Sequence, residues 1–245
     1  MQDDSRAAQA REPIFNVPAV VVGLVAVFAV VHVARELLGE DDADWLVIAL
    51  AFVPGRYGEL GAEVPGAPWA AATSFFTHML VHGNVSHLVI NSAWLLAVGT
   101  PIARRLGVAR FVGFFTLCGV AGAGLFGVVH WAEMVPMVGA SGAISGLMGA
   151  VFRLLYAAHD MSGRMLLREH PEVAPCLSLV ETFTDRPALT AIAVWVIVNF
   201  VFAVGLGGLV APGGVAWEAH LGGFFAGLLA FGVFDRGPRA AHQSA

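Results

Sequence analysis

Long apolar runs with few charges dominate the chain. A helix that crosses a lipid bilayer needs about 20 mostly apolar residues. Stretches that lack Asp, Glu, Lys and Arg predict six such helices. They lie near residues 16–37, 85–103, 111–131, 139–157, 187–207 and 217–235. The pattern therefore predicts an all-α membrane protein with six membrane-spanning helices.

The connection between the first two predicted spans departs from this pattern. Its apolar segment, Trp45–Gly55, is free of charge for only 11 residues, which is too short for a crossing. We interpret it as a piece that lies on the membrane surface or re-enters the membrane. The expected fold is a six-helix bundle with a large re-entrant or interfacial first outer loop.

Composition and charge exclude several other classes of protein. Charged residues make up 13% of the chain, against about 25% in soluble domains. The net charge of −5 comes without a basic tract, which argues against nucleic acid as a partner. Two cysteines, Cys118 and Cys176, are too few for a disulfide scaffold or a thiolate metal cluster.

Orientation follows from arginine, because the chain contains no lysine. With the N-terminus in the cytoplasm, eleven arginines fall on the cytoplasmic side and only Arg35 and Arg56 fall outside, as the positive-inside rule requires. The expected organisation is a cytoplasmic tail (1–15), a membrane domain (16–235) and a second cytoplasmic tail (236–245). The Arg-only, Ala-rich composition suggests a GC-rich bacterial genome, and hence a multi-pass protein of the bacterial inner membrane.

Polar side chains inside the predicted spans need an explanation, because burying them in lipid costs free energy. His87 and Asn91 are four residues apart and so share one helical face near the outer end of the second span. They are either hydrogen-bond donors of a site or polar contacts between helices. A metal site built from His78, His82 and His87 is a third interpretation, although no carboxylate lies near them in sequence.

A second polar group lies where the fourth span is expected to begin. Ser141 is part of Gly139-Ala140-Ser141-Gly142, shortly after Pro136, and proline is common at helix starts. Free backbone N–H groups there can bind a developing oxyanion. The alternative is that these small residues serve close helix packing and that Ser141 is merely one of them.

The third polar group lies about one turn into the last span. His220 is three residues before Gly223, which with Gly227 forms a face that can touch another helix closely. The alternative is an interfacial histidine bonded to a loop.

The direction of the spans brings these groups together. The second, fourth and sixth spans all run from outside to inside, so His87, Asn91, Ser141 and His220 are expected at one depth. A hydroxyl, a base to take its proton and hydrogen-bond donors form a complementary set for nucleophilic chemistry. The pattern therefore suggests one shared cavity near the outer face.

These motifs resemble those of the rhomboid intramembrane serine proteases in their six-span bacterial form. The resemblance covers roughly residues 40–235, and Trp69 is similar to the tryptophan of the family's outer loop. The matching motifs are His78, His82, His87-x-x-x-Asn91, Gly139-Ala140-Ser141-Gly142 and Ala219-His220-Leu221-Gly222-Gly223-x-x-x-Gly227.

The resemblance implies a rhomboid-like bundle that hydrolyses peptide bonds in or beside the transmembrane segment of a membrane-protein substrate. Ser141 would be the nucleophile and His220 its general base. His87, Asn91 and the backbone N–H of Ser141 would stabilise the oxyanion.

The resemblance also implies supporting residues and partners. His82, Gly139 and Gly142 would support the catalytic residues without acting on the substrate themselves. The implied partners are a transmembrane protein substrate and membrane lipid, with no metal and no organic cofactor.

Three departures from the family pattern concern supporting positions. Ser145 replaces an aromatic residue that often packs on the base, so the orientation of the base must come from elsewhere. Ala70 replaces an arginine that often follows the outer-loop tryptophan. Ala103, four residues before Gly107, replaces a glutamate.

A third catalytic member is not apparent among the carboxylates. Glu218 lies on the opposite helical side from His220 and near the headgroups, and Asp235 is at the other membrane surface. A Ser–His dyad is therefore expected.

The segment Gly205–Trp217 contains five glycines and Pro212 and is either a mobile lid or a plain connector. By family geometry, the fifth span with Trp195, Phe200 and Phe202 would border the lateral access route.

Two rival functions belong to other classes. A catalytically silent rhomboid-like protein would bind transmembrane helices without cutting them, but such relatives typically lack the serine or the histidine. A proton-coupled transporter would show inverted repeats and acidic residues inside the bundle, and the sequence shows neither.

Overall fold

The computed structural model of the chain describes residues 17–59, 61–66, 68–158, 160–202 and 214–237. Its described elements are helical, apart from an isolated antiparallel bridge between Phe52 and Met137. The α-helices are α1 (Ala19–Glu36), α2 (Glu40–Leu50), α3 (Trp69–Thr77), α4 (Val85–Trp94), α5 (Thr100–Leu106), α6 (Val108–Val129), α7 (Ser141–Leu155), α8 (Met161–Glu169), α9 (Leu179–Thr184), α10 (Arg186–Val201) and α12 (Trp217–Phe234).

Apolar helices occupy each of the six predicted spans. Four segments are long and apolar enough to cross a membrane: Ala19–Glu36, Val85–Leu106, Val108–Val129 and Trp217–Phe234. The helices α7 and α10 are apolar but shorter, with 15 and 16 residues. Residues 203–207 of the fifth predicted span lie outside the described residues. The chain is thus an all-helical integral membrane protein that crosses the membrane several times.

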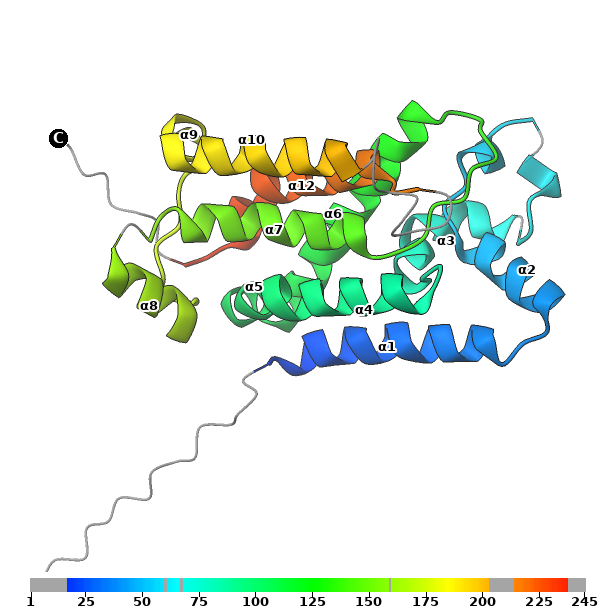
Figure 1. Cartoon of the computed structure of the whole chain (residues 1–245), viewed down its shortest axis with the longest axis horizontal. Coiled ribbons are helices and arrows are strands. Elements are labelled where there is room, and N and C mark those ends of the chain that lie inside the picture. Colours follow the sequence, from blue (N-terminus) through cyan, green and yellow to red (C-terminus); the bar gives the residue numbers. More distant parts are fainter. Residues whose placement is uncertain (1–16, 60, 67, 159, 203–213, 238–245) are drawn as a thin grey trace, which may run out of the picture.

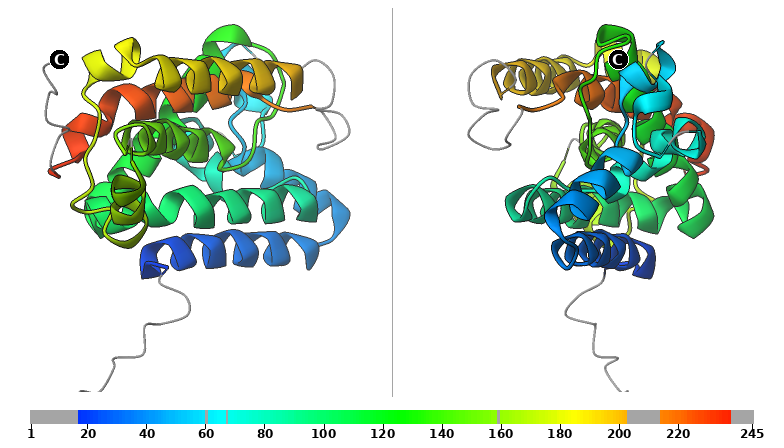
Figure 2. Two further views of the ribbon diagram at one scale, coloured as in Figure 1. Left: turned by 60° about the vertical axis from the view of Figure 1, so that its left-hand side comes forward. Right: turned by 90° about the vertical axis from the view of Figure 1, so that its right-hand side faces the viewer.

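The six apolar helices alternate in direction (Figure 1). Helices α4, α7 and α12 begin at the end of the bundle that lies on the right in Figure 1, which we call the near end. Helices α1, α6 and α10 begin at the opposite, far end. The first described residues and the end of α12 therefore lie together at the far end, as the even number of predicted spans requires. Figures 1 and 2 both show α1 beside α4 and α10 beside α12.

The first long connection lies at the near end, and its described helices are too short to cross a membrane. Helix α2 has 11 residues, ends at Leu50 and covers only the first part of the apolar segment Trp45–Gly55. The buried guanidinium of Arg56 then donates hydrogen bonds to the carbonyl oxygens of Ile48 (2.8 Å) and Pro65 (2.7 Å). Arg56 thereby anchors the loop that leads into α3, whose Ala70 stands where the resemblance implies an arginine. The position of this loop relative to the membrane surface stays a prediction.

Glycines bring the central helices α6, α7 and α12 into backbone contact. A Cβ atom on Gly223 of α12 would lie 1.9 Å from the carbonyl oxygen of Gly142 on α7, and one on Gly227 would lie 2.1 Å from that of Gly146. Helices in lipid gain little from the hydrophobic effect, so close packing of small residues is a main source of their association. We call this glycine contact between α7 and α12 the α7–α12 seam.

Arginines hold the far end together. The buried side chain of Arg105 makes two hydrogen bonds to the carboxylate of Asp235, at 2.8 and 2.9 Å, and also donates to the carbonyl oxygens of Pro171 (2.6 Å) and Ala174 (2.7 Å). These bonds tie the α8–α9 connection to the end of α12. They provide loop anchoring close to Ala103, where the family's glutamate is missing.

Candidate active site

Ser141 is the first residue of α7. The preceding Gly139 has φ +112°, which favours glycine, and its N–H donates to the carbonyl oxygen of His78 at 2.8 Å. This bond fixes the chain just before the helix begins. The first N–H groups of a helix have no partner within it and carry its positive dipole end. The hydroxyl of Ser141 therefore sits where backbone donors are available for an anion.

His220 is the fourth residue of α12 and meets Ser141 across the seam. Its Nε2 atom lies 2.8 Å from Ser141 Oγ, although the two residues are 79 positions apart in the chain. The contact depends on the seam, because Gly142 and Gly223 let the helix backbones approach beside it. The structure thus brings together the two residues that the sequence predicts as nucleophile and base.

The other ring nitrogen of His220 has a partner that the sequence analysis missed. His220 Nδ1 lies 2.8 Å from Oδ1 of Asn199, a buried residue of α10. The Nδ2 group of Asn199 donates to the carbonyl oxygen of Trp217 at 3.2 Å. A signal existed in the sequence, since an asparagine within an apolar helix is costly in lipid and calls for a partner. From the sequence alone, only carboxylates were candidates for this place.

His87 and Asn91 come from α4, and His87 lies beside the segment that leads into α7. The ring of His87 rests against Gly139, where a Cβ atom would be only 2.6 Å from His87 Cε1. Asn91 is buried, and its Nδ2 group donates to the carbonyl oxygen of His87 at 2.9 Å. An amide nitrogen carries two hydrogens, so one remains for a further acceptor. The structure places His87 next to the chain segment that ends in Ser141.

Two further histidines, His82 and His78, are buried close to His87 and Gly139. The buried ring of His82 packs against those of His87 and Phe28, with centroid distances of 5.1 and 4.9 Å. His78 is also buried, and its Nδ1 is bonded to the carbonyl oxygen of Ser74 at 2.9 Å. Among the described residues there is no group of three or more His, Cys, Asp or Glu side chains able to hold a metal ion. The metal interpretation therefore gains no support from the geometry.

Glu218 and Asp235 have partners other than His220. Glu218 is buried at the start of α12, and its Oε1 atom lies 3.0 Å from Nε2 of His130, just beyond the end of α6. The other nitrogen of His130 is bonded to Glu133 at 2.8 Å. Burial lowers the pKa of His130, but these two carboxylates raise it by more, so the net shift is upward. This cluster joins the near ends of α6 and α12.

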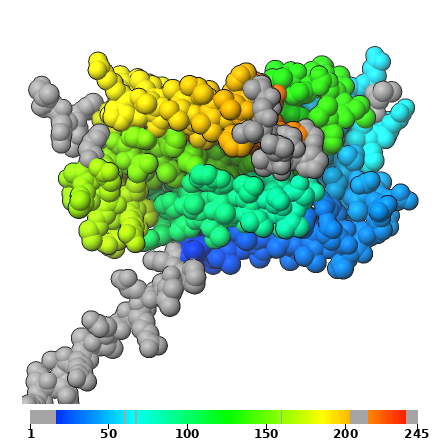
Figure 3. All heavy atoms as spheres, viewed as in Figure 1, coloured from blue at the N-terminus to red at the C-terminus, as the bar shows by residue number. Residues whose placement is uncertain are grey.

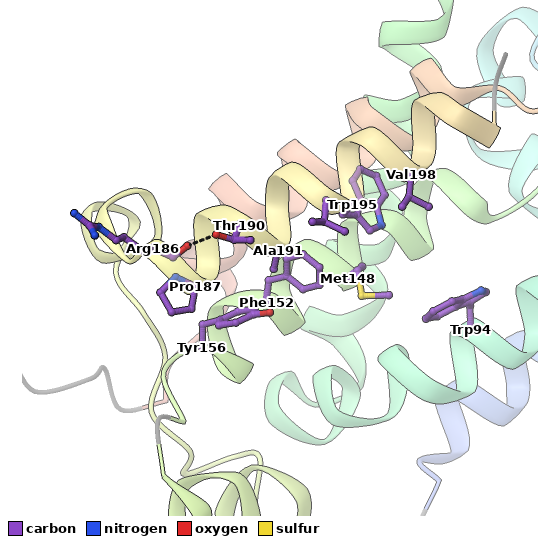
Figure 4. Close-up of a pocket in the computed structure, with 11 residues that line it drawn as sticks. Trp94, Met148, Phe152, Tyr156, Arg186, Pro187, Thr190, Ala191, Trp195 and Val198 are labelled. Carbon is purple, nitrogen blue, oxygen red and sulfur yellow. Dashed lines mark hydrogen bonds between the residues drawn. The ribbon is translucent and has the colours of Figure 1, made fainter. Parts of the chain in front are cut away.

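An apolar groove of about 830 Å³ runs between α4, α7 and α10 (Figure 4). Figure 3 shows the surface hollowed where α4 and α10 flank α7. The groove is lined by Trp94, Met148, Phe152, Tyr156, Arg186, Pro187, Thr190, Ala191, Val194, Trp195 and Val198. Its last lining residue on α10, Val198, directly precedes Asn199. The groove therefore leads along α10 toward the level of the Ser141–His220 contact.

Fold and site together define a multi-pass helical membrane protein with a serine–histidine contact between two of its helices. Comparison with known families gives the class a name, because the model of the Rhomboid domain matches residues 70–236. The match covers more than half of the chain, and the chain belongs to the rhomboid family. This confirms the resemblance noted in the sequence motifs.

Two relatives come from Bacillus subtilis (strain 168). The chain is 30% identical over 164 residues to the protein named Rhomboid protease GluP, an alignment that covers 65% of this chain and 27% of that protein. It is 32% identical over 92 residues to the "Putative rhomboid protease YdcA", covering 36% of this chain and 44% of that protein. The chain thus spans less than half the length of each relative.

Proposed function

We propose that the protein is an intramembrane serine endopeptidase that cleaves transmembrane segments of membrane proteins. The observation that carries the proposal is the 2.8 Å distance between Ser141 Oγ and His220 Nε2, at the start of a helix inside a membrane bundle. A hydroxyl at this distance from an imidazole can pass its proton to the ring as it attacks. Membership of the rhomboid family supports the same chemistry.

The proposed reaction has two halves. His220 Nε2 accepts the Ser141 proton while Oγ attacks the scissile carbonyl carbon, and the C–N bond then breaks as His220 returns the proton to the leaving amine. A water molecule next gives a proton to His220 Nε2 while its oxygen attacks the acyl carbon. The ester C–Oγ bond then breaks and His220 returns the proton to Oγ, which releases the new carboxyl end and restores Ser141. In both halves the oxyanion is held by N–H groups at the start of α7, with His87 and Asn91 beside them.

The proposed topology is that of a six-span inner-membrane protein of a bacterium. It counts the shorter helices α7 and α10 as crossings and puts the far end of the bundle on the cytoplasmic side. The segments 1–15 and 236–245 would then be cytoplasmic tails. The alternation of helix directions supports it (Figure 1), as does the distribution of arginine. The active site would then lie near the outer face. The tails lie outside the described residues, except for 236–237.

The proposed substrate is a transmembrane helix, and the groove between α4 and α10 is where we expect it to dock. The lining is largely apolar, which suits a helix that leaves lipid without exposing polar groups. A bound helix must unwind locally before its backbone can be cut, so helix-breaking residues and a small residue at the cleavage site are expected. Most of the segment Gly205–Trp217, interpreted as either a lid or a plain connector, lies outside the described residues.

Labelling with a fluorophosphonate probe in liposomes, together with cleavage of a model transmembrane substrate, tests the proposal. The wild-type protein should label and cleave, Ser141→Ala should do neither, and His220→Ala should lose most of both activities. Ser145→Ala, one turn along the same helix, is the matched control and should label like the wild type. Equal labelling of Ser141→Ala would overturn the proposal. A wild type that binds substrate but neither labels nor cleaves would favour a catalytically silent rhomboid-like protein.

A further inference from the structure

We propose that Asn199 is a positioning residue that holds the base, His220, in its reactive tautomer and orientation. This inference rests on the proposed function, because it assigns Asn199 a task in the same reaction. The observation behind it is a chain of three hydrogen bonds, from Ser141 Oγ to His220, from His220 to Asn199 and from Asn199 to the Trp217 carbonyl. These bonds connect α7, α12 and α10 through one imidazole ring.

The orientation of the Asn199 amide follows from which of its atoms can donate a hydrogen bond and which can accept one. In the observed orientation, the Nδ2 donor faces the carbonyl oxygen of Trp217 and the Oδ1 acceptor faces His220. The reversed amide would place Oδ1 against a carbonyl oxygen, and two acceptors at that distance repel each other. The backbone of α12 therefore selects the amide orientation, and with it the kind of atom offered to the ring.

The amide orientation in turn selects the tautomer of His220. Oδ1 can only accept a hydrogen bond, so His220 Nδ1 must carry the proton. In a neutral imidazole the other nitrogen then has the free lone pair. That nitrogen is Nε2, which faces the hydroxyl of Ser141. The ring is thus held in the form that can take the proton of the nucleophile.

A neutral amide suits this depth in the membrane better than a carboxylate would. An ionised side chain buried in the bundle carries a large desolvation cost, whereas an amide can accept the same hydrogen bond without a net charge. When His220 becomes an imidazolium, the Asn199 carbonyl dipole still faces the positive Nδ1–H group. Asparagine fills the equivalent place beside histidine in the Cys-His-Asn arrangement of papain-like proteases.

Asn199 also accounts for the departure at position 145. Rhomboid proteases often have an aromatic residue there that packs on the base, whereas this chain has Ser145. With that support missing, the hydrogen bond from α10 provides the orientation instead. The same face of α10 carries Ile192, which packs on Phe224 and Leu228 of α12. Asn199 is therefore the polar end of an otherwise apolar helix contact.

A purely structural role for Asn199 makes different predictions, so matched variants can separate the two. Asn199→Leu keeps the size but removes the acceptor, and Asn199→Asp restores an acceptor. Ile192→Ala weakens the same helix contact two turns away without touching His220. Each variant is reconstituted in liposomes as the full chain, and kcat, KM, thermal stability and the rate of fluorophosphonate labelling are measured.

We expect Asn199→Leu to lower kcat and the labelling rate by about 10–10²-fold, with KM within about twofold, because a general base contributes about 10²–10⁴-fold and a misoriented one loses part of it. Asn199→Asp should recover at least about half of that loss on a logarithmic scale. Ile192→Ala should lower thermal stability but keep kcat close to the wild-type value.

Nitrogen-15 NMR of histidine-labelled protein gives a readout that does not depend on turnover. The wild type should show a hydrogen-bonded Nδ1–H signal that is absent from His220→Ala, which assigns it. We expect this signal to be lost in Asn199→Leu and kept in Ile192→Ala.

Three outcomes would overturn the inference while leaving the proposed function intact. One is a wild-type kcat in Asn199→Leu, another is the Nδ1–H signal surviving in that variant, and the third is equal loss of kcat in Ile192→Ala. A wild type without any Ser141-dependent activity would instead refute the proposed function, and the NMR signal would still decide whether Asn199 sets the tautomer.

Discussion

Helix α12 meets two of its neighbours, α7 and α10, in opposite ways. Against α7 the contact is made by backbone, with Gly223 and Gly227 so close that a single Cβ atom would fall about 2 Å from a carbonyl oxygen of the other helix. Against α10 the contact is made by side chains, chiefly by the ring of Trp195 stacked on Phe224 at a centroid distance of 4.0 Å. Helix α10 also borders the apolar groove, whereas the seam leaves no room for a side chain.

The two contacts of α12 therefore control two different features of the site, the Ser141–His220 distance and the orientation of the imidazole ring. The α7–α12 seam sets the distance between Ser141 and His220, and a backbone contact is well suited to this because it has no rotamers to adjust. The α10–α12 contact reaches the far nitrogen of the imidazole through Asn199 and sets the angle of the ring. Distance and orientation are thus determined by different helices, and substitutions can change them separately.

Gly223→Ala should have the largest effect. The added methyl group would overlap the Gly142 carbonyl oxygen, so the helices must separate and Ser141 must move away from His220. We expect cleavage to fall by more than about 100-fold, because a displacement of about 1 Å can have that effect. Rates in liposomes and thermal unfolding in detergent measure it. The control is Gly124→Ala on α6, where a Cβ atom meets nothing within 4 Å. Wild-type cleavage by Gly223→Ala would show that the seam does not set the distance.

Trp195→Ala should have a smaller effect of another kind. It removes the stacking on Phe224, worth about 0.5–1.5 kcal/mol beyond the area that it buries, and enlarges the groove. We expect lower thermal stability and a KM raised by about 3–10-fold, since 1.4 kcal/mol corresponds to a factor of ten, while kcat changes less than KM. Steady-state kinetics in liposomes separate the two constants. A loss of kcat as large as that of Gly223→Ala would mean that α10 also sets the distance.

The smallest predicted effect concerns a third contact of α12, the cluster of His130, Glu133 and Glu218. Because the folded-state pKa of His130 is raised, its contribution to stability is fully present below the unfolded pKa and is lost as the pH rises through the folded pKa. His130 is only partly buried and its pair with Glu133 is exposed. Exposed ion pairs are worth about 0.2–1 kcal/mol, so the change should be small. Thermal unfolding between pH 5.5 and about 8.5, compared with His130→Gln, checks it. An equal pH dependence in both proteins would contradict the prediction.

Three supporting positions of this chain, 70, 103 and 145, differ from the family pattern. The structure contains three hydrogen-bonded side chains that the motifs do not include. Arg56 holds the first long connection, Arg105 holds the far end through Asp235, and Asn199 contacts the base. These side chains come from other elements, so a comparison of motifs position by position misses them.

The sequence by itself determined the membrane character, the places of the six apolar helices and the Ser141–His220 pair. Each of these depends on local or periodic information: runs of apolar residues long enough to span lipid, small residues at regular intervals, and motifs on helices that run the same way. The family follows from the same motifs. The predicted start of the fourth span near 139–141 agrees with α7, which begins at Ser141.

Only the tertiary structure decided which groups complete the site. Asn199 and His220 are 21 residues apart, with residues 203–213 between them outside the described part, and no sequence period relates the two. The partners of Glu218 and Asp235 likewise come from distant elements, His130 and Arg105. The physical reason is that a hydrogen bond requires two particular atoms within about 3 Å and suitably aimed. Helix packing alone brings such atoms together, whereas sequence periodicity reports only which face of each helix they occupy.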